Sequence, residues 1–290
     1  MADTTVSKQM HSYSYLIPAF LIYGVLFIVP TLMSFFFSMT VWTLKDYSFV
    51  GLDNFKMFLS EDSLRIGIKN TMIYAMMTSG LKVIIALFLA VFLSSGLRSQ
   101  NFLRSIVFFP NLVSTLAVGL TFSSLMHPTR GVFNTFLARF GVEGPDWLCN
   151  VNIALYSIIS VDVWKGLGVA TIIYLAGIQA IPKDYYEAAS IDGASKWHMF
   201  LHITLPLVKP SMNSVIILSF IGGMRSFDLI WAMTQGGPGF ATDVVASIVY
   251  KQYASGYYGL SIAGNVIMFL MISIFAFPLY RFLIKREEAV

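Results

Sequence analysis

The sequence predicts an all-α, polytopic membrane protein in which six helices cross the bilayer. Of its 290 residues, 57% are hydrophobic and only 12% are charged. Soluble domains have about 25% charged residues, so this composition cannot cover a water-exposed surface. Six largely uncharged stretches also reach the roughly 20 residues that a helix needs to cross the hydrocarbon core. The chain is therefore expected to lie in a membrane, with helices throughout.

The six predicted spans follow one another along the chain. They cover residues 13–41, 70–95, 105–126, 153–180, 211–232 and 260–283. The first is expected to be a retained span, because its apolar part exceeds the roughly 7 to 15 residues of a signal-peptide core and no small-residue cleavage site follows. No linker or repeat interrupts the chain, so one membrane domain (13–284) is expected between short tails, 1–12 and 285–290.

Positive charges in the connections predict the orientation of the spans. With both termini inside, nine Lys and Arg residues of the tails and connections lie in the cytoplasm and seven lie outside. The compact connection with Arg98 and Arg104 and the terminal Lys285 and Arg286 favour this arrangement, because cytoplasmic segments near spans are enriched in positive charge. Both termini are therefore expected in the cytoplasm.

The sequence lacks the motifs of common enzymes. It has no phosphate-binding glycine loop, zinc-protease helix, serine-hydrolase elbow or paired-cysteine redox motif. His198 and His202 stand four residues apart without a third ligand nearby, and the single Cys149 excludes an internal disulfide. We therefore expect no catalytic activity, metal site or cofactor in this chain and, without a basic run, no nucleic-acid partner.

The connection between the fourth and fifth spans is expected to form two short helices at a bend. Gly193 can adopt the left-handed conformation that ends the first helix, and Ser195 can cap the second. Asp184 and Glu187 have the spacing of a capping box, and Pro206 is expected to end the second helix. The two helices are therefore defined by local chemistry.

Apolar side chains on this connection are costly in water unless another surface covers them. Tyr185 and Ala188 lie on one side of the first helix, and Trp197, Phe200 and Leu201 lie on one side of the second. The cover is either the protein's own helix ends and the lipid headgroups, or a groove on a partner protein. The residues alone leave both interpretations open.

The spacing of this connection resembles a known sequence motif. Glu187, Ala188 and Ala189, then Gly193, then Ile203, Leu205 and Pro206 resemble the EAA loop of permease subunits of binding-protein-dependent ABC importers. The resemblance implies that residues 183–206 form coupling helices in a cleft of cytoplasmic ATPase subunits, and that the fold is of ABC importer type I. The implied docking residues are Glu187, Ala188, Ala189, Asp192, Gly193, Trp197, Phe200, Ile203, Leu205 and Pro206.

Two further stretches resemble the carbohydrate branch of that family, which includes maltose and glycerol-phosphate permeases. They are residues 49–55 (FVGLDNF) and residues 227–238 (FDLIWAMTQGGP), the latter followed by Ala241 and Thr242. The resemblance implies import of a sugar, oligosaccharide or polyol across the cell membrane by alternating access. It also implies a second, commonly non-identical permease, two ATPase subunits that bind ATP and Mg, and an extracytoplasmic solute-binding protein.

Five charged residues fall inside predicted spans, where each costs roughly 2.5 to 3.5 kcal/mol near the bilayer centre. They are Lys82, Asp162, Lys165, Arg225 and Asp228. Asp162 with Lys165, and Arg225 with Asp228, stand three residues apart and are expected to screen each other, whereas Lys82 is expected to reach the interface. These pairs are either purely structural or line a polar path, beside which Trp164 and Trp231 offer aromatic surface to sugar rings.

The family resemblance also implies where a solute binds, midway along the spans that flank the EAA loop. The implied residues are Asn111, Asp162, Gly166, Ser219, Gly222 and Gly223. Because Gly222 and Gly223 stand where some relatives carry amides, the partner permease is an alternative holder of the site.

Two other classes of function stay open at this stage. An ion-gradient-driven secondary transporter would use Asp162 and Asp228 as its ion sites. An integral-membrane enzyme or scaffold is the other class, but the sequence shows no arrangement of nucleophile and base.

Overall fold

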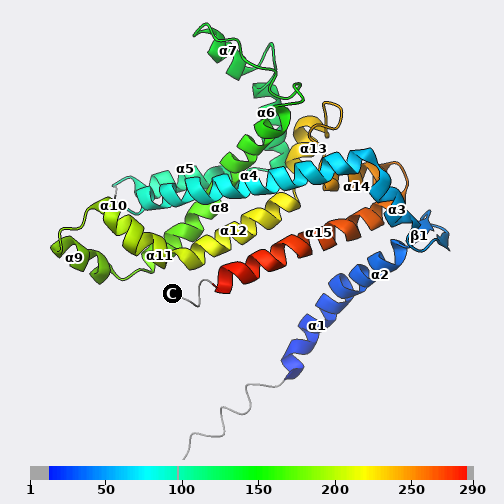
Figure 1. Cartoon of the computed structure of the whole chain (residues 1–290), viewed down its shortest axis with the longest axis horizontal. Coiled ribbons are helices and arrows are strands. Elements are labelled where there is room, and N and C mark those ends of the chain that lie inside the picture. Colours follow the sequence, from blue (N-terminus) through cyan, green and yellow to red (C-terminus); the bar gives the residue numbers. More distant parts are fainter. Residues whose placement is uncertain (1–12, 97, 286–290) are drawn as a thin grey trace, which may run out of the picture. The chain divides into compact units, whose positions relative to one another are not determined.

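The computed structural model describes residues 13–96 and 98–285. The predicted tail 1–12 and residues 286–290 of the predicted tail 285–290 lie outside the described residues, whereas Lys285 is the last residue of the last described helix. Helices dominate, which confirms the all-α class, and they are accompanied by one two-stranded antiparallel sheet, β1 (Thr40–Trp42) with β2 (Tyr47–Phe49) (Figure 1). The chain divides into two compact units, residues 13–60 with 251–267, and residues 61–250 with 268–285.

In the first unit, the predicted first span ends earlier than expected. It consists of η1 (Tyr13–Leu16), α1 (Ile17–Tyr23), a π-turn η2 (Gly24–Ile28) and α2 (Val29–Phe37). Residues 40–42 form β1 instead of the last turn of the span. Pro18 and Pro30 fall in the first turns of α1 and α2, where a proline without an N–H is tolerated.

The side-chain amide of Asn54 stabilises the connection that follows α2 in the first unit. Asn54, in α3 (Asp53–Ser60), donates from Nδ2 to the carbonyl oxygens of Ser38 at 2.9 Å and Thr40 at 2.8 Å. Both carbonyls lie between the end of α2 and β1, so Asn54 fixes the turn between the helix and the sheet.

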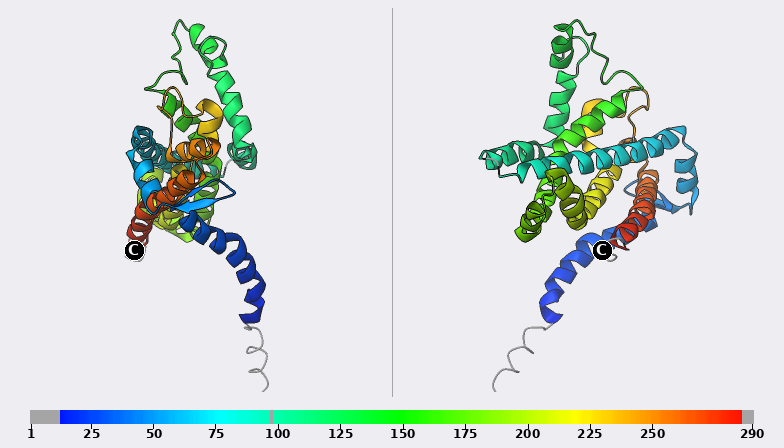
Figure 2. Two further views of the ribbon diagram at one scale, coloured as in Figure 1. Left: turned by 90° about the vertical axis from the view of Figure 1, so that its right-hand side faces the viewer. Right: turned by 60° about the vertical axis from the view of Figure 1, so that its left-hand side comes forward.

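The second unit is built on three helices that pack side by side. They are α4 (Asp62–Leu93), α8 (Ala154–Gln179) and α12 (Lys209–Met224) (Figures 1 and 2). Membrane helices associate through close packing of small residues. Gly223 of α12 meets α4 in this way, because an added Cβ would lie 2.7 Å from the Cα of Ala75.

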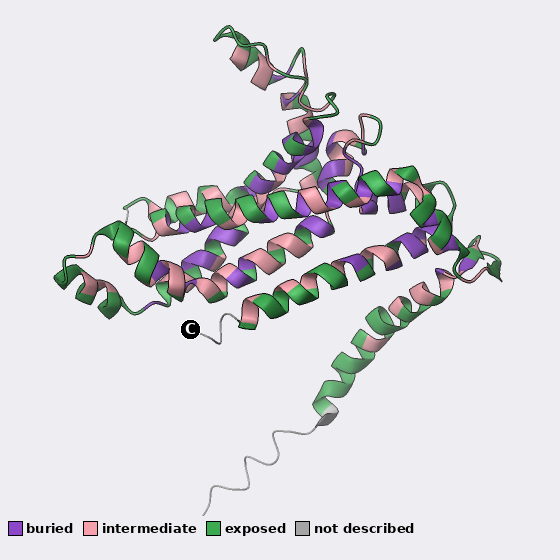
Figure 3. Ribbon diagram, in the orientation of Figure 1, coloured by how far each residue is buried: buried purple, intermediate pink, exposed green. Residues whose placement is uncertain are grey.

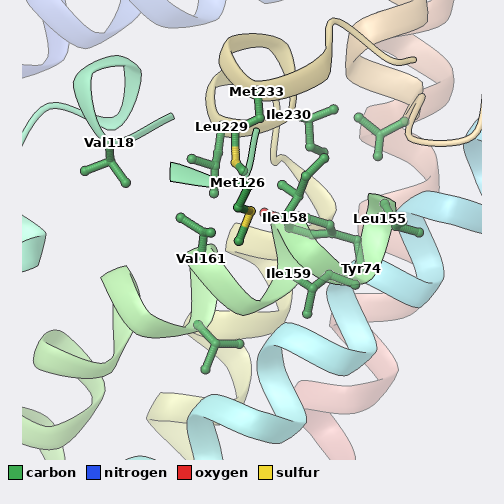
Figure 4. Packing of buried hydrophobic residues seen from close by; sticks show 12 residues of the cluster. Tyr74, Val118, Met126, Leu155, Ile158, Ile159, Val161, Leu229, Ile230 and Met233 are labelled. Carbon is green, nitrogen blue, oxygen red and sulfur yellow. The ribbon is translucent and has the colours of Figure 1, made fainter. Parts of the chain in front are cut away.

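Buried side chains gather in two clusters within this unit. One cluster includes Tyr74 and Ile158 with Leu229 and Ile230 of α13 (Asp228–Thr234) (Figure 4). The other joins α4 and α8 nearer to the end where α9 (Lys183–Ile191) begins. The long helices keep exposed outer faces, as a bilayer requires (Figure 3).

Two predicted spans are broken instead of continuous. The third consists of α5 (Gln100–Leu112) and α6 (Thr115–Leu125), which meet at 95°. Pro110 lacks an N–H, and Val113 and Ser114 adopt extended conformations, so the helix cannot continue. The fifth ends at Met224, and three residues separate it from α13. Within residues 13–96 and 98–285, four helices are long and apolar enough to span a bilayer, or up to six if each bent pair is one span, and this total is compatible with the predicted number.

The remaining helices are the last predicted span and the short helices of the connections. α7 (Val132–Ala138) follows α6, and α14 (Val245–Ala254) precedes α15 (Tyr258–Lys285), which is the predicted sixth span. α10 (Lys196–Met199), a π-turn η3 (Phe200–Thr204) and α11 (Leu205–Leu207) complete the connection that α9 begins.

Candidate functional site

An ion pair joins α4 to α8 inside the second unit. Lys82 Nζ lies 2.6 Å from Asp162 Oδ2, and the two side chains are only 12% and 23% exposed. The expected pairing of Asp162 with Lys165 is therefore wrong, as is the expectation that Lys82 extends to the interface. The reason is tertiary, because α4 brings a lysine to Asp162 from 80 residues away in the sequence.

Gly166 makes room for this ion pair. It lies one helical turn after Asp162, and an added Cβ would lie 2.8 Å from Lys82 Nζ. A larger residue at this position would require the end of the lysine side chain to shift. The absence of a side chain at Gly166 therefore leaves space for the ammonium group.

A small cavity lies beside the ion pair. Its wall is mostly apolar, and we name it the polar cavity after the three polar side chains that line it. Its volume is about 170 Å³, and Lys82, Asn111, Gly166, Ser219 and Gly222 are among its lining residues. Four of the residues predicted for a solute pathway are thus brought together from α5, α8 and α12. An ammonium, an amide and a hydroxyl group border the cavity, while Leu218 and other apolar residues complete its wall. Such a wall can donate hydrogen bonds to a hydroxylated solute.

The other predicted pathway residues lie elsewhere. Gly223 is buried against α4 and serves packing. Trp164 is 43% exposed, and its ring centroid lies 5.2 Å from that of Phe122. Lys165 is half-buried and does not line the cavity. These three positions therefore give no polar surface to the cavity.

The predicted pairing of Arg225 with Asp228 on one helical face is wrong. Arg225 is the C-terminal cap of α12, and Asp228 is the first residue of α13. The chain between them is not helical, and both residues are exposed. Trp231, on α13, contacts Phe227 and Tyr250 in an aromatic cluster instead of facing the cavity.

The connection between α8 and α12 has the predicted bend. Gly193 adopts the left-handed conformation with φ of 77°, and Ser195 Oγ accepts a hydrogen bond of 3.2 Å from the backbone N–H of His198. The predicted capping box does not form. Pro182 is the N-terminal cap of α9, so Asp184 lies inside the helix instead of at its cap, and Glu187 is not three residues after the cap.

Pro206 does not end the second helix of this connection. The helix continues through the π-turn η3 to Leu207, and its axis then bends by 66° at Val208. The proline is tolerated because it lies in the first turn of α11, after the wider π-turn. The bend turns the chain into α12.

The predicted docking residues separate into an exposed group and an anchoring group. Glu187, Ala188, Asp192, Gly193 and Trp197 are exposed, with Trp197 at 61%. Ala189, Phe200, Ile203, Leu205 and Pro206 are half-buried. The apolar cover left open by the sequence is thus partly the protein's own.

One contact attaches this connection to the helix bundle, and another holds the connection together. The Phe200 ring stacks 6.0 Å from that of Phe88 in α4 and 5.3 Å from that of Trp197. The Tyr186 hydroxyl lies 3.0 Å from Thr204 Oγ1, which joins α9 to η3. Side-chain contacts thus connect α9 to η3 and η3 to α4.

An amide that sequence reasoning missed holds the loop after α13. Asn70 Nδ2 donates to the carbonyl oxygens of Ala241 and Asp243, each at 2.9 Å. Within the loop, Thr242 Oγ1 donates to the Gly237 carbonyl at 2.7 Å, and Gly236 has a φ of 91°. The only sequence signal was an amide at the start of an apolar stretch.

Spanning helices around a polar cavity, with an exposed two-helix connection at one end, define a membrane transport subunit. Residues 82–288 match the family described as binding-protein-dependent transport system inner membrane component. The chain belongs to this family, which confirms the resemblance seen in the sequence.

Individual relatives agree with this assignment. The trehalose/maltose transport system permease protein MalF of Thermococcus litoralis is 34% identical over 90% of this chain and 89% of its own length. The arabinooligosaccharides transport system permease protein AraP of Bacillus subtilis is 32% identical over 86% of this chain and 80% of its own. A chain of a bacterial ABC transporter involved in alginate import has the same fold, with a TM-score of 0.81 and 22% identity over 94% of both chains.

Proposed function

We propose that this permease carries an oligosaccharide, sugar or related polyol into the cell by alternating access. It pairs with a second permease, receives solute from an extracytoplasmic binding protein, and depends on two ATPase subunits that bind ATP and Mg. Both termini lie in the cytoplasm. The relatives named for trehalose, maltose and arabinooligosaccharide transport support this class of solute.

The observation that carries the solute class is the polar cavity beside the ion pair. Asn111 and Ser219 offer neutral hydrogen-bonding groups, and Lys82 keeps N–H donors beyond the one that Asp162 accepts. Because the carboxylate balances the ammonium charge, the wall suits uncharged hydroxyl groups.

The size of the cavity supports a shared path. Its roughly 170 Å³ is well below the 300 to 1,000 Å³, approximately, of complete small-molecule sites. We infer that this chain forms one wall and that the second permease faces it.

Coupling to ATP hydrolysis is assigned to the exposed group of the connection. Glu187, Ala188 and Trp197 are accessible to an ATPase cleft, whereas Phe200 anchors the connection to α4. Movement of the ATPases would shift α9, and the anchoring contacts would pass that shift to the bundle. The loaded binding protein must favour the outward-facing state, since a ligand shifts an equilibrium only by its differential affinity for the two states.

Reconstituted transport tests this function. Ser219→Trp fills the cavity and is expected to abolish ATP-driven uptake of labelled maltose, trehalose or arabinooligosaccharides while ATPase subunits still co-purify. Ser214→Trp is the matched control, because Ser214 is exposed on the same helix and outside the cavity lining. Uptake that needs no ATP and collapses with an ionophore would establish the ion-gradient alternative instead.

A further inference from the structure

A second cavity lies at the end of the bundle where α4 and α8 terminate. Its volume is about 500 Å³, and it is bounded by the last turn of α4 and the residues after it, the end of α8, and the connection from α9 to η3. Its lining residues belong neither to the polar cavity nor to the exposed docking group. We call it the basal groove.

The groove has an apolar floor and a basic rim. Val91, Ile178 and Phe200 contribute to the floor, whereas Lys183 and Lys196 lie on the rim. Both lysines are exposed, and none of the described residues that line the groove is acidic. The groove is thus built for an amphiphile with a negative head.

A third positive group, which does not line the groove, lies at the end of α4. Arg104 donates from Nη2 to the carbonyl oxygen of Leu93, the last residue of α4, at 3.2 Å. Its Nε–H is buried and has no hydrogen-bond partner within the described chain. The guanidinium offsets the partial negative charge at the carbonyl end of α4, which would otherwise repel an anion.

The length of α4 puts the groove at headgroup depth. Its 32 residues extend about 48 Å at 1.5 Å per residue. A bilayer is about 40 to 45 Å thick with its headgroups, so a helix that begins at one surface ends at the other. Basic pockets between spanning helices on the cytoplasmic side are sites for anionic lipid headgroups.

We propose that the basal groove binds an anionic phospholipid. The phosphate lies between Lys183 and Lys196, and an acyl chain lies along Val91 and Ile178. The assignment to the cytoplasmic leaflet rests on the orientation in the proposed function. The bound lipid links the end of α4 to the start of the coupling connection.

Native mass spectrometry of the purified transporter tests the proposal without any transport measurement. The probe is phosphatidylglycerol, compared with phosphatidylcholine of identical acyl chains, and the readout is lipid retained on this chain after its release from the complex. Lys183→Gln with Lys196→Gln is expected to weaken phosphatidylglycerol retention about thirtyfold, the factor that two surface lysines supply. Lys183→Arg with Lys196→Arg is expected to retain it.

The matched control removes the same charge from the other end of α4. Arg65 and Lys69 are both exposed there, so Arg65→Gln with Lys69→Gln is expected to leave retention unchanged. Equal loss in both double variants, unchanged retention in the Lys183 and Lys196 variant, or displacement of the lipid by inorganic phosphate would each overturn the proposal. Retained lipid with loss of ATPase subunits in that variant would assign the lysines to ATPase docking instead.

Because the readout is lipid mass, failure of this proposal leaves the proposed transport function intact. Conversely, lost uptake in Ser219→Trp has no bearing on lipid retention.

Discussion

Removing Lys82 tests whether the ion pair between α4 and α8 stabilises the bundle. Lys82→Met keeps most of the aliphatic side chain but leaves Asp162, which is 23% exposed, without its partner 2.6 Å away. Breaking a buried ion pair from one side costs about 3 to 5 kcal/mol, and the partial exposure favours the lower value. At roughly 2 to 4 °C per kcal/mol, the unfolding midpoint is expected to fall by about 6 to 12 °C.

The assay is thermal unfolding of the purified transporter, followed by tryptophan fluorescence. Lys82→Met with Asp162→Leu is expected to recover most of the loss, because replacing both partners of a buried pair with apolar residues is often neutral. Lys56→Met is the control, since its ion pair with Asp53 at 3.0 Å is exposed and contributes little. Additive effects of the two substitutions, or an unchanged midpoint in Lys82→Met, would refute the reasoning.

Three further substitutions test the connections. Gly193→Val introduces a β-branched residue at a φ of 77°, which costs roughly 1 to 2 kcal/mol of folding free energy. The variant is expected to uncouple ATP hydrolysis from uptake in vesicles, and normal coupling would contradict the role of the bend. Asn70→Leu leaves two carbonyl oxygens without their donor, which costs about 1 to 3 kcal/mol of folding free energy. Proteolysis within residues 235–244 is expected to become faster, and unchanged cleavage would show that the loop does not depend on Asn70. Trp197→Ala should reduce ATPase co-purification without lowering the unfolding midpoint, whereas Phe200→Ala should lower the midpoint; the reverse pattern would exchange the docking and anchoring assignments.

The sequence predicted the spanning helices well where hydropathy alone decides them. The spans realised as α8 and α15 were found within two residues of their observed bounds, and the end of α4 was found equally closely. The start of α4 at Asp62 was missed by eight residues, because residues 62–69 include several charged residues that hydropathy excludes. The breaks at Val113 and Ser114, and after Met224, were missed. A broken helix at membrane depth is tolerated only where neighbouring protein or water satisfies the freed backbone groups, and hydropathy does not report such neighbours.

In the connection between α8 and α12, too, the local features were predicted and the tertiary contacts were not. Gly193 and Ser195 were recognised because their effects are local, as a left-handed residue and a helix cap act within a few positions. The division of the apolar residues into exposed Trp197 and anchoring Phe200 was not predictable, since it depends on a contact with Phe88 in another helix.

By itself, the sequence determined that the chain is a helical membrane protein, because composition and span length are properties of the linear chain. The spacing of the residues from Glu187 to Pro206 added the resemblance to permeases of binding-protein-dependent transporters, which the family match confirmed. Only the tertiary structure decided that Asp162 pairs with Lys82, that Gly166 makes room for the ammonium, and that Asn111, Ser219 and Gly222 border one cavity. Helical periodicity restricts the partners of a residue on its own helix. The partners on other helices depend on how the helices pack, which this one sequence does not state.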